Sequence, residues 1–332
     1  MPANPARQAT VLAVDGGNSK TDLALVSTDG RLLALVHGPT ISHQQVPIDV
    51  AMERLARLEA EARAAASSDG RATIASLCLA GADFASDIRT LERAIAALDL
   101  ADRVSVANDA FAGLRAGAPS GWGIVVVCGA GVNAAGMTPD GRRARLAALG
   151  EISGDWGGGY SLGMAALGAA VRARDGRGPA TSLSDLVPAR FGLTRPMDVT
   201  RGLYDGRIGS RQLEELAPLV FDAAVGGDAV ARGIVDRLAD ELAVMGIAIA
   251  RRLRMVRDEV DVVLAGGVFR TGDEAFFDRL NERLRKAMPR ARMQRLRERP
   301  VLGAALLGLD ALGVRRGGRQ ESALRSAVTA TD

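Results

Sequence analysis

Lysine and aromatic residues are scarce in this sequence of 332 residues. Only two of its 42 basic residues are lysines, Lys20 and Lys286, and phenylalanine, tryptophan and tyrosine together make up 3% of the chain. Acidic residues stand among the arginines, as at Asp236-Arg237, and the formal net charge is only +3. Charges of both signs mixed in this way are typical of a solvated surface, and few aromatic side chains are present to stack on bases. The composition therefore argues against a nucleic-acid partner.

Cysteine and histidine are also rare, with two residues of each. Cys78 and Cys128 stand at the ends of apolar runs and form no CxxC pair, which argues against a disulfide framework or a structural zinc site. No stretch approaches the roughly 20 apolar residues of a membrane span, and the first residues lack the apolar core of a secretory signal. We therefore expect a cytoplasmic protein with buried thiols and no membrane association.

The first part of the chain has the pattern of three strands joined by tight turns, followed by alternating helices and strands. The spacing of Met52, Leu55, Leu58 and Ala62 is helical, and short apolar runs bounded by turn residues are typical of strands. The predicted elements are strands at 10–14, 23–26 and 32–36, a helix at 49–66, a strand at 74–79, a helix at 87–98 and a strand at 104–107. This alternation predicts an α/β fold with helices on the faces of a mixed sheet.

The pattern of strand, glycine turn, strand and Asp-Gly turn occurs twice. Placing Asp29-Gly30 over Asp140-Gly141 also overlays the strand at 23–26 on an apolar run at 134–137. The strand at 124–127 then occupies the place of the strand at 10–14, and both are followed by glycine. Agreement of both turns and three strands predicts an internal duplication.

The rest of the chain is predicted to contain long amphipathic helices and one further buried strand. The pattern predicts helices at 229–256, 275–287 and 301–313 and a strand at 262–265. Small and turn-forming residues gather at 117–121, so we place a domain boundary there and expect domains at 10–118 and 119–314, with the last helix (301–314) packing back on the first domain. The ends, 1–9 and 315–332, are expected to be disordered.

Three buried strands each end in a glycine-rich turn. The turns are Asp15-Gly16-Gly17, Gly129-Ala130-Gly131 and Gly266-Gly267. Glycine exposes backbone N–H groups that can surround phosphate oxygens, although a single glycine pair after a strand is often only a turn. Neither a P-loop nor a dinucleotide-binding spacing is present. Three such turns, two of them related by the repeat, favour binding of a polyphosphate.

The first of these turns carries the polar side chains that phosphate binding requires. After Asp15 come Asn18, Ser19, Lys20 and Thr21, and Lys20 is one of the two lysines in the chain. A carboxylate at a strand end can hold Mg²⁺ through water, and hydroxyls and a lysine can bind β- and γ-phosphates. The alternative is a solvated hairpin turn with no ligand.

With these motifs in view, the sequence resembles the BadF/BadG/BcrA/BcrD-type ATPases and, among them, the N-acetylglucosamine kinases. The resemblance spans about residues 10–314 and keeps the order of the motifs. The matching segments are the first phosphate motif at 14–21, the catalytic-aspartate segment at 108–110, the second phosphate motif at 127–133, a sugar-contacting segment at 150–158 and the adenosine motif at 264–269.

The resemblance implies a duplicated ribonuclease H-like, actin-like ATPase fold with two domains and a central cleft. It implies ATP and Mg²⁺ as cofactors, an amino sugar as the small-molecule substrate, and N-acetylglucosamine 6-phosphate as the expected product. Three glycine turns would contact ATP, through Gly16, Gly17, Asn18, Ser19, Lys20, Thr21, Gly129, Ala130, Gly131, Gly266 and Gly267, with Asp15 holding Mg²⁺ through water. The sugar would contact Ser42, His43, Asp109, Asn133, Gly150, Glu151 and Asp155. A homodimer is also compatible with the resemblance.

Asp109 is the candidate catalytic base. It follows a predicted strand, where a carboxylate can accept a proton from an attacking hydroxyl, but aspartate at that place is equally suited to cap a helix. The resemblance favours catalysis.

Several neighbouring residues keep two interpretations. Asp155 is a ligand for sugar hydroxyls or a stabiliser of its glycine-rich turn, and Asn133 contacts sugar or serves strand pairing. His43 contacts sugar or lies in a surface loop, and Trp156 stacks on sugar or packs in the core. Asp83 is a further candidate for the cleft, and we expect His37 to be structural.

Three departures from the animal N-acetylglucosamine kinases leave the sugar open. Ser42 stands where those enzymes have an asparagine that contacts sugar, Ala130 where they have threonine, and Glu151 where they have histidine. Glucosamine, N-acetylmuramic acid and N-acetylmannosamine are alternative acceptors. Two rival functions are an ATPase activator of a 2-hydroxyacyl-CoA dehydratase, which shares an iron–sulfur cluster between subunits, and an actin-like sensor or structural protein without a small substrate.

Overall fold

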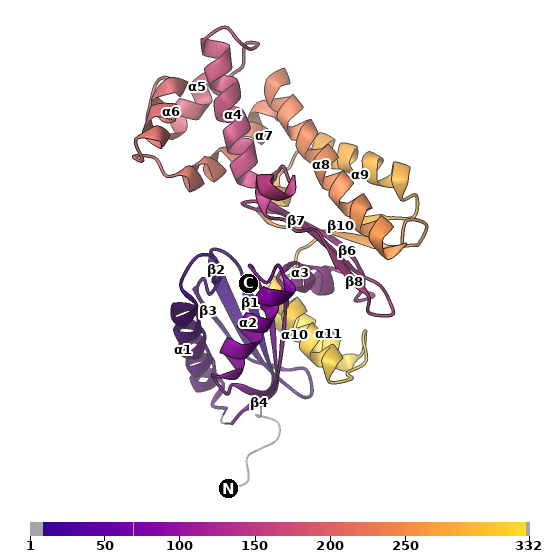
Figure 1. Ribbon diagram of the computed structural model, residues 1–332. Helices are drawn as coiled ribbons and strands as arrows, with labels where there is room; N and C mark the ends of the chain where they lie inside the picture. The colour runs from indigo at the N-terminus through magenta and orange to yellow at the C-terminus, as the bar shows by residue number, and fades with distance from the viewer. Residues whose placement is uncertain (1–8, 69, 330–332) are drawn as a thin grey trace. The chain divides into compact units, whose positions relative to one another are not determined.

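The computed structural model describes residues 9–68 and 70–329, which form two compact units (Figure 1). The first unit comprises the chain up to Gly123 together with the chain from Leu296 onward, and the second runs from Ile124 to Arg295. Each unit is built on a five-stranded sheet. Within the described ranges no helix has the length and apolar character needed to cross a membrane.

The sheet of the first unit has the strand order β3-β2-β1-β4-β5. The elements of this unit are β1 (Ala9–Gly16), β2 (Lys20–Ser27), β3 (Leu32–Pro39), α1 (Ile48–Ala66), β4 (Ala72–Leu79), α2 (Ala85–Ala96), β5 (Ala101–Asn108), α3 (Ala110–Gly117), α10 (Pro300–Ala311) and α11 (Arg319–Thr329). Strands β1, β2 and β3 pair antiparallel, whereas β1, β4 and β5 run parallel. The three parallel strands therefore end at the same edge of the sheet.

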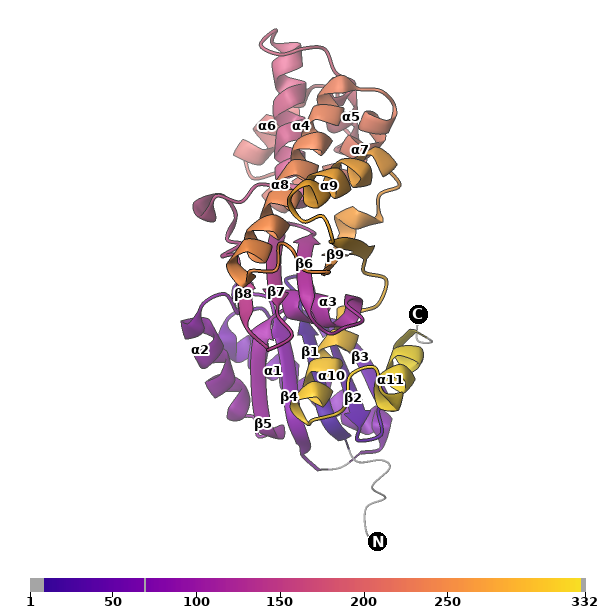
Figure 2. The same cartoon turned by 90° about the vertical axis from the view of Figure 1, so that its right-hand side faces the viewer.

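The central strand β1 is buried on both faces. Its residues from Val11 to Val14 have no exposed surface. Val14 belongs to a core cluster with Leu55 of α1 and Ile95 of α2, whereas Val11 lies against α10, where a Cβ on Gly308 would come within 2.4 Å of it. Figures 1 and 2 show α1 and α2 on one side of this sheet and α3 and α10 on the other. Coverage on both faces explains why these strands are continuous apolar runs in the sequence.

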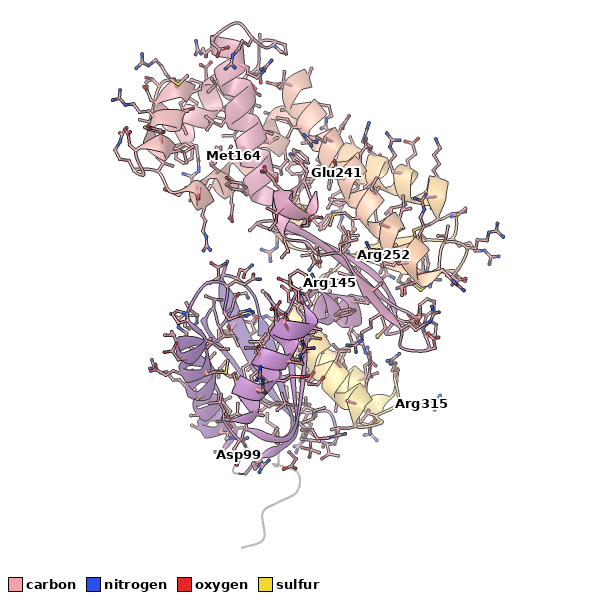
Figure 3. The ribbon with its side chains drawn as sticks, viewed as in Figure 1. Asp99, Arg145, Met164, Glu241, Arg252 and Arg315 are labelled. Carbon is pink, nitrogen blue, oxygen red and sulfur yellow. The ribbon has the colours of Figure 1, made fainter. Side chains whose placement is uncertain are left out.

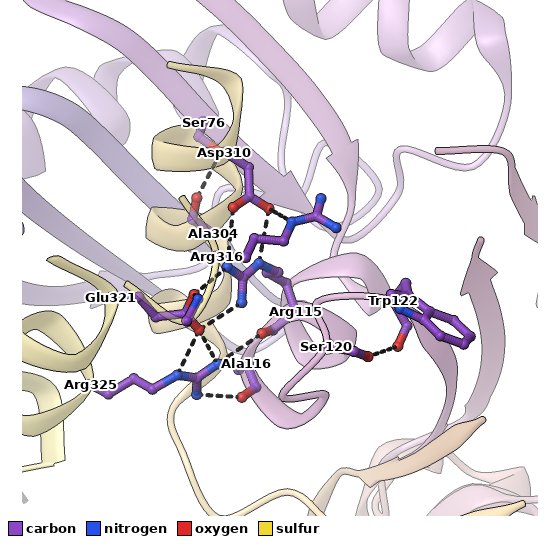
Figure 4. Close-up of polar contacts among 11 residues, drawn as sticks. Ser76, Arg115, Ala116, Ser120, Trp122, Ala304, Asp310, Arg316, Glu321 and Arg325 are labelled. Atoms are coloured by element: carbon purple, nitrogen blue, oxygen red, sulfur yellow. Dashed lines mark hydrogen bonds and ion pairs between the residues drawn. The ribbon is translucent and has the colours of Figure 1, made fainter. Parts of the chain in front are cut away.

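Helix α11 occupies 319–329 of the segment 315–332 that was predicted to be disordered, and so corrects that prediction there, whereas 330–332 lie outside the described residues. Arg115 of α3 is only 1% exposed, and it donates to both carboxylate oxygens of Asp310 (3.0 and 3.1 Å) and to both of Glu321 on α11 (3.0 and 2.8 Å) (Figure 4). A buried guanidinium requires such partners. Leu324 of α11 is also fully buried, so the helix is held by both charge pairing and packing.

The sheet of the second unit has the order β10-β9-β6-β7-β8. Its elements are β6 (Gly123–Cys128), β7 (Val132–Met137), β8 (Arg143–Arg145), η2 (Gly150–Ser153), α4 (Gly158–Arg174), α5 (Leu183–Arg190), α6 (Pro196–Tyr204), η3 (Ser210–Leu216), α7 (Ala217–Val225), α8 (Ala229–Leu253), β9 (Asp261–Ala265), η4 (Gly267–Arg270), α9 (Glu274–Ala287) and β10 (Arg292–Arg295), where η marks a 3₁₀ helix. Strand β9 runs parallel to both β6 and β10.

The two units confirm the predicted internal duplication. Replacing β1 to β5 by β6, β7, β8, β9 and β10 in turn converts the strand order of the first sheet into that of the second. The two Asp-Gly turns are also closed by the same bonds. The amide of Ser27 donates to the carbonyl of Arg31 at 3.0 Å. In the second unit, the amide of Thr138 donates to the carbonyl of Arg142 at 2.9 Å. The predicted α/β class and its mixed, duplicated sheet are therefore correct.

Helix α8 is the longest element and has clear end signals. At its start, the side chain of Asp228 accepts hydrogen bonds from the amides of Val230 (2.9 Å) and Ala231 (3.0 Å), which is a standard N-cap. Near its end, Arg252 donates to the carbonyl of Arg145 at 2.9 Å, which ties the helix to β8 (Figure 3). The predicted helix at 229–256 is confirmed, with its end at Leu253.

The division of the chain differs from the predicted domains at 10–118 and 119–314. Along the chain, the boundary between the units falls between Gly123 and Ile124, and the chain returns to the first unit at Leu296. Helix α10 belongs to the first unit, because its Gly303 packs so closely on α3 that an added Cβ would lie 1.8 Å from the carbonyl oxygen of Ala112. Of the predicted disordered N-terminal segment, residues 1–8 lie outside the described residues, and Ala9 begins β1.

Candidate functional site

Candidate residues of the first unit gather where its parallel strands end. Gly16 of β1 is paired with Leu79 of β4, and Leu79 is paired with Asn108 of β5. Asp15 therefore lies one residue before the paired ends of these strands, and Asp109 lies one residue after them. Both carboxylates lie at the edge where α/β sheets place their ligands.

Asp15 carries a strongly perturbed carboxyl group. Its half-buried position removes water from the carboxylate, and the negative charges of Asp109 and Asp22 repel it, which together raise its pKa to about 8 despite the opposing effect of Lys20. Carboxylates that repel each other in this way form a site that a cation would stabilise.

The structure bears on the two interpretations of Asp109. Asp109 precedes the first residue of α3, but within the described chain its side chain makes no capping hydrogen bond to that helix. The amide of Ala110 instead donates a hydrogen bond to the side-chain oxygen of Asn108 at 3.2 Å. The half-buried carboxylate of Asp109 thus has no capping role in α3, which favours the proposal that it acts as a base.

The first glycine turn, predicted to bind phosphate, is a compact bend between β1 and β2. The amide of Gly17 donates to the carbonyl of Lys20 at 2.9 Å, and the hydroxyl of Thr40 donates to the carbonyl of Gly17 at 2.8 Å. Asn18 and Ser19 are exposed at its tip. Thr21 is fully buried, and its hydroxyl oxygen has no hydrogen-bond partner among the described residues. The turn is therefore held from outside by Thr40.

Lys20 and His37 both contact the buried carboxylate of Asp22. The Lys20 ammonium lies 3.1 Å from Asp22 Oδ2, and the lysine side chain is 70% exposed. Asp22 Oδ1 lies 2.8 Å from His37 Nδ1, and Arg299 lies 3.2 Å from His37 Nε2. His37 thus bridges two charged groups, in agreement with the structural role expected for it.

The loop after β3 places two unsatisfied polar atoms near the same edge. Ser42 is 1% exposed, and its hydroxyl has no hydrogen-bond partner within the described residues; the same is true of the buried Nδ1 of His43. A Cβ on Gly81, just past β4, would lie 2.9 Å from the His43 ring, so the two loops touch. Buried polar atoms normally have partners, so this pair is suited to a ligand.

In the second unit, two of the glycine turns line one cavity of about 590 Å³. Gly129 and Ala130 follow β6, and Gly267 follows the neighbouring parallel strand β9. The cavity has the size of a small-molecule site. It is lined by Gly129, Ala130, Gly159, Glu214, Ala217, Pro218, Phe221, Asp222, Gly267, Val268, Arg270, Thr271 and Gly272.

Glycine is required at two positions next to this cavity wall, Gly266 before Gly267 and Gly158 before Gly159. Gly266 has φ +110°, and a Cβ there would lie 2.3 Å from the carbonyl oxygen of Cys128. Gly158 has φ +79°, and its Cβ would lie 2.5 Å from the carbonyl oxygen of Ala130. The first turn of α4 also donates to the carbonyls of the phosphate turn, from Gly159 to Gly129 at 2.8 Å and from Tyr160 to Ala130 at 3.1 Å. These bonds hold the turn rigidly against the start of α4.

The predicted sugar segment forms a separate loop that ends at Gly157. Gly150 begins a 3₁₀ turn, Glu151 is exposed, and Asp155 is half-buried and accepts a hydrogen bond from Ser153. Asn133 is half-buried near the start of β7. None of these residues lines the cavity described above. A Cβ on Gly157 would lie 2.8 Å from Val132, which places the end of the loop against the start of β7.

Trp156 lies under a cationic side chain. The guanidinium carbon of Arg237, on α8, lies 3.9 Å from the centre of the indole ring, a cation–π arrangement. Of the two interpretations of Trp156, the contact favours packing, because one ring face is covered by protein.

Sequence reasoning missed much of the cavity wall. Glu214, Asp222, Arg270 and Thr271 line it, and none was predicted. Burial raises the pKa of Glu214, which marks it as a carboxyl group partly withdrawn from water. Arg270 and Thr271 lie within a few residues of the Gly266-Gly267 turn, so proximity to that motif was a usable signal. Glu214 and Asp222 come from distant helical segments and had none.

Comparison with known proteins matches this architecture to one family. The model of the BadF/BadG/BcrA/BcrD ATPase family matches residues 12–308. The N-acetyl-D-glucosamine kinase of Dictyostelium discoideum is 28% identical over 313 residues, covering 90% of this chain and 97% of that protein. The N-acetylmuramic acid/N-acetylglucosamine kinase of Clostridium acetobutylicum is 27% identical over 307 residues, with the same coverage.

Solved structures agree on the fold. A Chromobacterium violaceum protein described as a candidate N-acetylglucosamine kinase superposes with a TM-score of 0.70 at 26% identity, covering 91% of this chain and 99% of that one. A glucokinase of the ROK family from Streptomyces griseus superposes with a TM-score of 0.54 at 18% identity, covering 90% and 98%. This chain therefore belongs to the BadF/BadG/BcrA/BcrD family of ATPases, whose members use ATP.

Proposed function

We propose that this protein is an ATP-dependent kinase that phosphorylates an amino sugar, with N-acetylglucosamine as the expected acceptor and N-acetylglucosamine 6-phosphate as the product. The observation that carries the proposal is the cavity of the second unit, which is bounded by the second phosphate turn at Gly129-Ala130 and by the adenosine turn at Gly267. Two glycine turns after neighbouring parallel strands leave little side-chain bulk on this part of the wall, so a nucleotide can approach the backbone closely. Family membership and the two curated kinase relatives support the same activity.

Asp109 is assigned as the general base. In the reaction the acceptor hydroxyl loses its proton to this carboxylate while its oxygen bonds to the γ-phosphorus of ATP and the bond to the β-phosphate oxygen breaks, releasing ADP. Asp109 follows β5 directly and does not cap α3. Lys20 and the amides of the turn after Gly17 are assigned to the charge of the transferred phosphoryl group.

The residues around Asp15 fit a magnesium ion bound with ATP. The pKa of Asp15 is raised by burial and by the charges of Asp109 and Asp22, and a divalent cation would relieve the repulsion between these carboxylates. Among the described residues no three His, Cys, Asp or Glu side chains gather into a site able to hold a metal by themselves. Mg²⁺ usually keeps several waters and takes one or two protein carboxylates together with phosphate oxygens, so a single aspartate suits it. The ion would neutralise charge on the phosphates.

Each unit carries residues that the sequence predicts to contact the acceptor. In the first unit these are the buried, unsatisfied hydroxyl of Ser42 and Nδ1 of His43. In the second they are Asn133, Asp155 and the turn at Gly150-Glu151. Ser42 stands where the animal enzymes have an asparagine, and its shorter side chain changes the contact available to the acceptor at this position.

N-acetylmuramic acid is the second candidate acceptor, because the Clostridium relative carries both sugars in its name and matches over the same share of the chain. Glucosamine is a further alternative. The dehydratase-activator function is less well supported, since both cysteines are fully buried and burial raises the pKa of the Cys128 thiol to about 12. A buried, protonated thiol is poorly suited to bind a cluster shared between subunits.

The test is ATP consumption with a panel of acceptors. Purified protein with Mg²⁺ and ATP is offered N-acetylglucosamine, N-acetylmuramic acid, glucosamine, N-acetylmannosamine and glucose, and both ADP and sugar phosphate are measured. We expect the highest kcat/KM with N-acetylglucosamine and phosphate on its 6-hydroxyl. ATP consumption that does not depend on any sugar would contradict the proposal and favour the actin-like sensor. The oligomeric state, for which a homodimer is compatible with the resemblance, is measured separately by light scattering after size-exclusion chromatography.

A further inference from the structure

Asp83 connects two segments that carry candidate site residues. It stands in the loop after β4, and each of its carboxylate oxygens has its own partner. Oδ2 accepts a hydrogen bond from Gln44 Nε2 at 2.8 Å, and Oδ1 accepts one from Asn108 Nδ2 at 3.1 Å. Hydrogen bonds to a carboxylate are among the stronger ones in proteins. Gln44 lies in the loop after β3 and Asn108 is the last residue of β5, so Asp83 bridges two separate elements.

One side of this bridge leads to Asp109. Asn108 is 3% exposed, and while its Nδ2 bonds Asp83, its Oδ1 accepts a hydrogen bond from the amide of Ala110 at 3.2 Å. Asn108, which precedes Asp109, is therefore hydrogen-bonded to Ala110, which follows it. Through Asn108, Asp83 fixes the backbone on both sides of the candidate base.

The other side leads to the loop of Ser42 and His43. Gln44 follows them directly, and the loop is closed by hydrogen bonds from the amides of Gln45 and Val46 to the carbonyl of Ser42, at 2.9 and 3.1 Å. Because the turn is closed, holding Gln44 also holds Ser42.

The position of Asp83 is itself well defined. Its amide and that of Phe84 lie 3.3 and 2.8 Å from Asp87 Oδ2 at the start of α2. In addition, Gly81 has φ +84° and approaches both His43 and Gln44 so closely that an added Cβ would lie within 3.1 Å of each. The backbone that carries the Asp83 carboxylate is thus held in place independently of Gln44 Nε2 and Asn108 Nδ2.

We propose that Asp83 is a positioning residue, which holds the loop of Ser42 and His43 at a fixed distance from Asp109 so that the acceptor hydroxyl and the base meet in the reactive orientation. The inference rests on the proposed kinase function and adds a residue to it. Asp83 touches neither ATP nor the transferred phosphoryl group in this role; it acts through Asn108 and Gln44.

The test compares Asp83→Ala with Asp83→Asn. Alanine removes both bonds, and we expect kcat with the acceptor to fall about 10- to 100-fold while KM for the acceptor rises and KM for ATP is unchanged, since a small displacement of a reacting group has effects of this size. Asparagine can accept from Asn108 with its oxygen and donate to the oxygen of a turned Gln44 amide. We therefore expect it to restore kcat to within about threefold of the wild type.

A matched control and a second variant keep the test decisive. Asp102→Ala removes an exposed aspartate at the other end of β5 and should leave kcat unchanged. Gln44→Ala removes only one exposed partner, which carries little risk to folding, and should raise KM for the acceptor about 3- to 10-fold. If Asp83→Asn is as impaired as Asp83→Ala, or if neither Asp83→Ala nor Gln44→Ala differs from the wild type, the positioning role is overturned. If the wild-type protein consumes no ATP with any sugar, the kinase proposal and this inference both fail. This outcome is distinguished from failure of the positioning role alone, because it is seen in the wild-type protein before any variant is made.

Discussion

Replacing Asp15 by asparagine should stabilise the ligand-free protein near neutral pH. Burial and the charges of Asp109 and Asp22 raise the pKa of Asp15 to about 8, whereas in the unfolded chain the pKa keeps its ordinary value of 3.8. Between about pH 4 and pH 8 the unfolded chain therefore releases a proton that the folded protein retains. Stability falls as the pH rises through this window, because the folded state binds more protons. Asparagine has no proton to lose and escapes this effect.

The magnitude follows from the width of that window. Each pH unit between the pKa of the unfolded chain and the pH of the measurement contributes about 1.4 kcal/mol. At pH 7 only the part of the shift between 3.8 and 7 counts, which gives an upper limit of about 4 kcal/mol. Asp15 is half-buried and keeps some access to water, which reduces the value to roughly 2 to 4 kcal/mol. The same substitution should remove most of the phosphoryl-transfer activity, since the carboxylate proposed to bind Mg²⁺ through water is lost.

Urea unfolding as a function of pH is the assay. The chain has two tryptophans, Trp122 and Trp156, and only Trp122 belongs to the first unit. In a Trp156→Phe background, Trp122 fluorescence reports unfolding of the unit that contains Asp15. The difference in unfolding free energy between Asp15→Asn and the background should be close to zero at pH 4, should grow with pH, and should level off above pH 8. An exposed control, Asp102→Asn, should show no such trend.

The reasoning would be refuted by a difference that does not change with pH, or that shrinks as the pH rises. The first result would mean that Asp15 titrates normally in the folded protein. The second would mean that the folded protein stabilises the Asp15 carboxylate, for example by pairing it with Lys20 more strongly than Asp109 and Asp22 repel it.

Two further predictions concern the framework of each unit. Glu321→Ala leaves the buried guanidinium of Arg115 with only the partly exposed Asp310 as a carboxylate partner among the described residues, so we expect a loss of about 2 to 4 kcal/mol of stability, measured by urea unfolding. Arg319→Ala on the same helix is the unaffected control. Gly266→Ala forces a Cβ to within 2.3 Å of the Cys128 carbonyl at a φ of +110°, so the neighbouring Gly267 in the wall of the proposed nucleotide cavity must move. We expect ATP affinity to fall at least about tenfold by calorimetry, and unchanged affinity would contradict the assignment of this turn.

Most of the sheet framework could be predicted because its signals are local. Apolar runs between turn residues predicted eight of the strands at nearly their observed places. The turns at Asp29-Gly30 and Asp140-Gly141, together with the strands around them, revealed the duplication. These signals depend on neighbours in the sequence, which is why they could be read without a structure.

The errors arise where structure depends on distant partners. Helix α11 was predicted as disordered because its sequence is polar, but its Glu321 is neutralised by Arg115, far away in the chain on α3. The helices from α4 to α7 had no clear periodic signal; α5, for example, contains Pro188. Their contribution of Glu214 and Asp222 to the cavity depends on how these segments pack.

The candidate site was predicted in part for the same reason. Strand-end motifs located Asp15, Asp109 and the glycine turns, because a strand followed by a polar or glycine turn is visible in the sequence. The alternatives for Asp109 could not be separated there, since base and helix cap use the same residue type. The capping bond made by Asn108 in its place became visible only in the structure.

The most direct test of the account is the effect of Asp109→Asn on catalysis and on binding separately. With the preferred sugar of the acceptor panel, we expect kcat to fall by about 100- to 10,000-fold, the range that a general base contributes, while calorimetry gives an ATP affinity within about twofold of the wild type. Near-normal turnover by this variant would contradict the assignment of Asp109 as the base. Loss of ATP binding together with turnover would show that the residue supports the nucleotide site and not the acceptor.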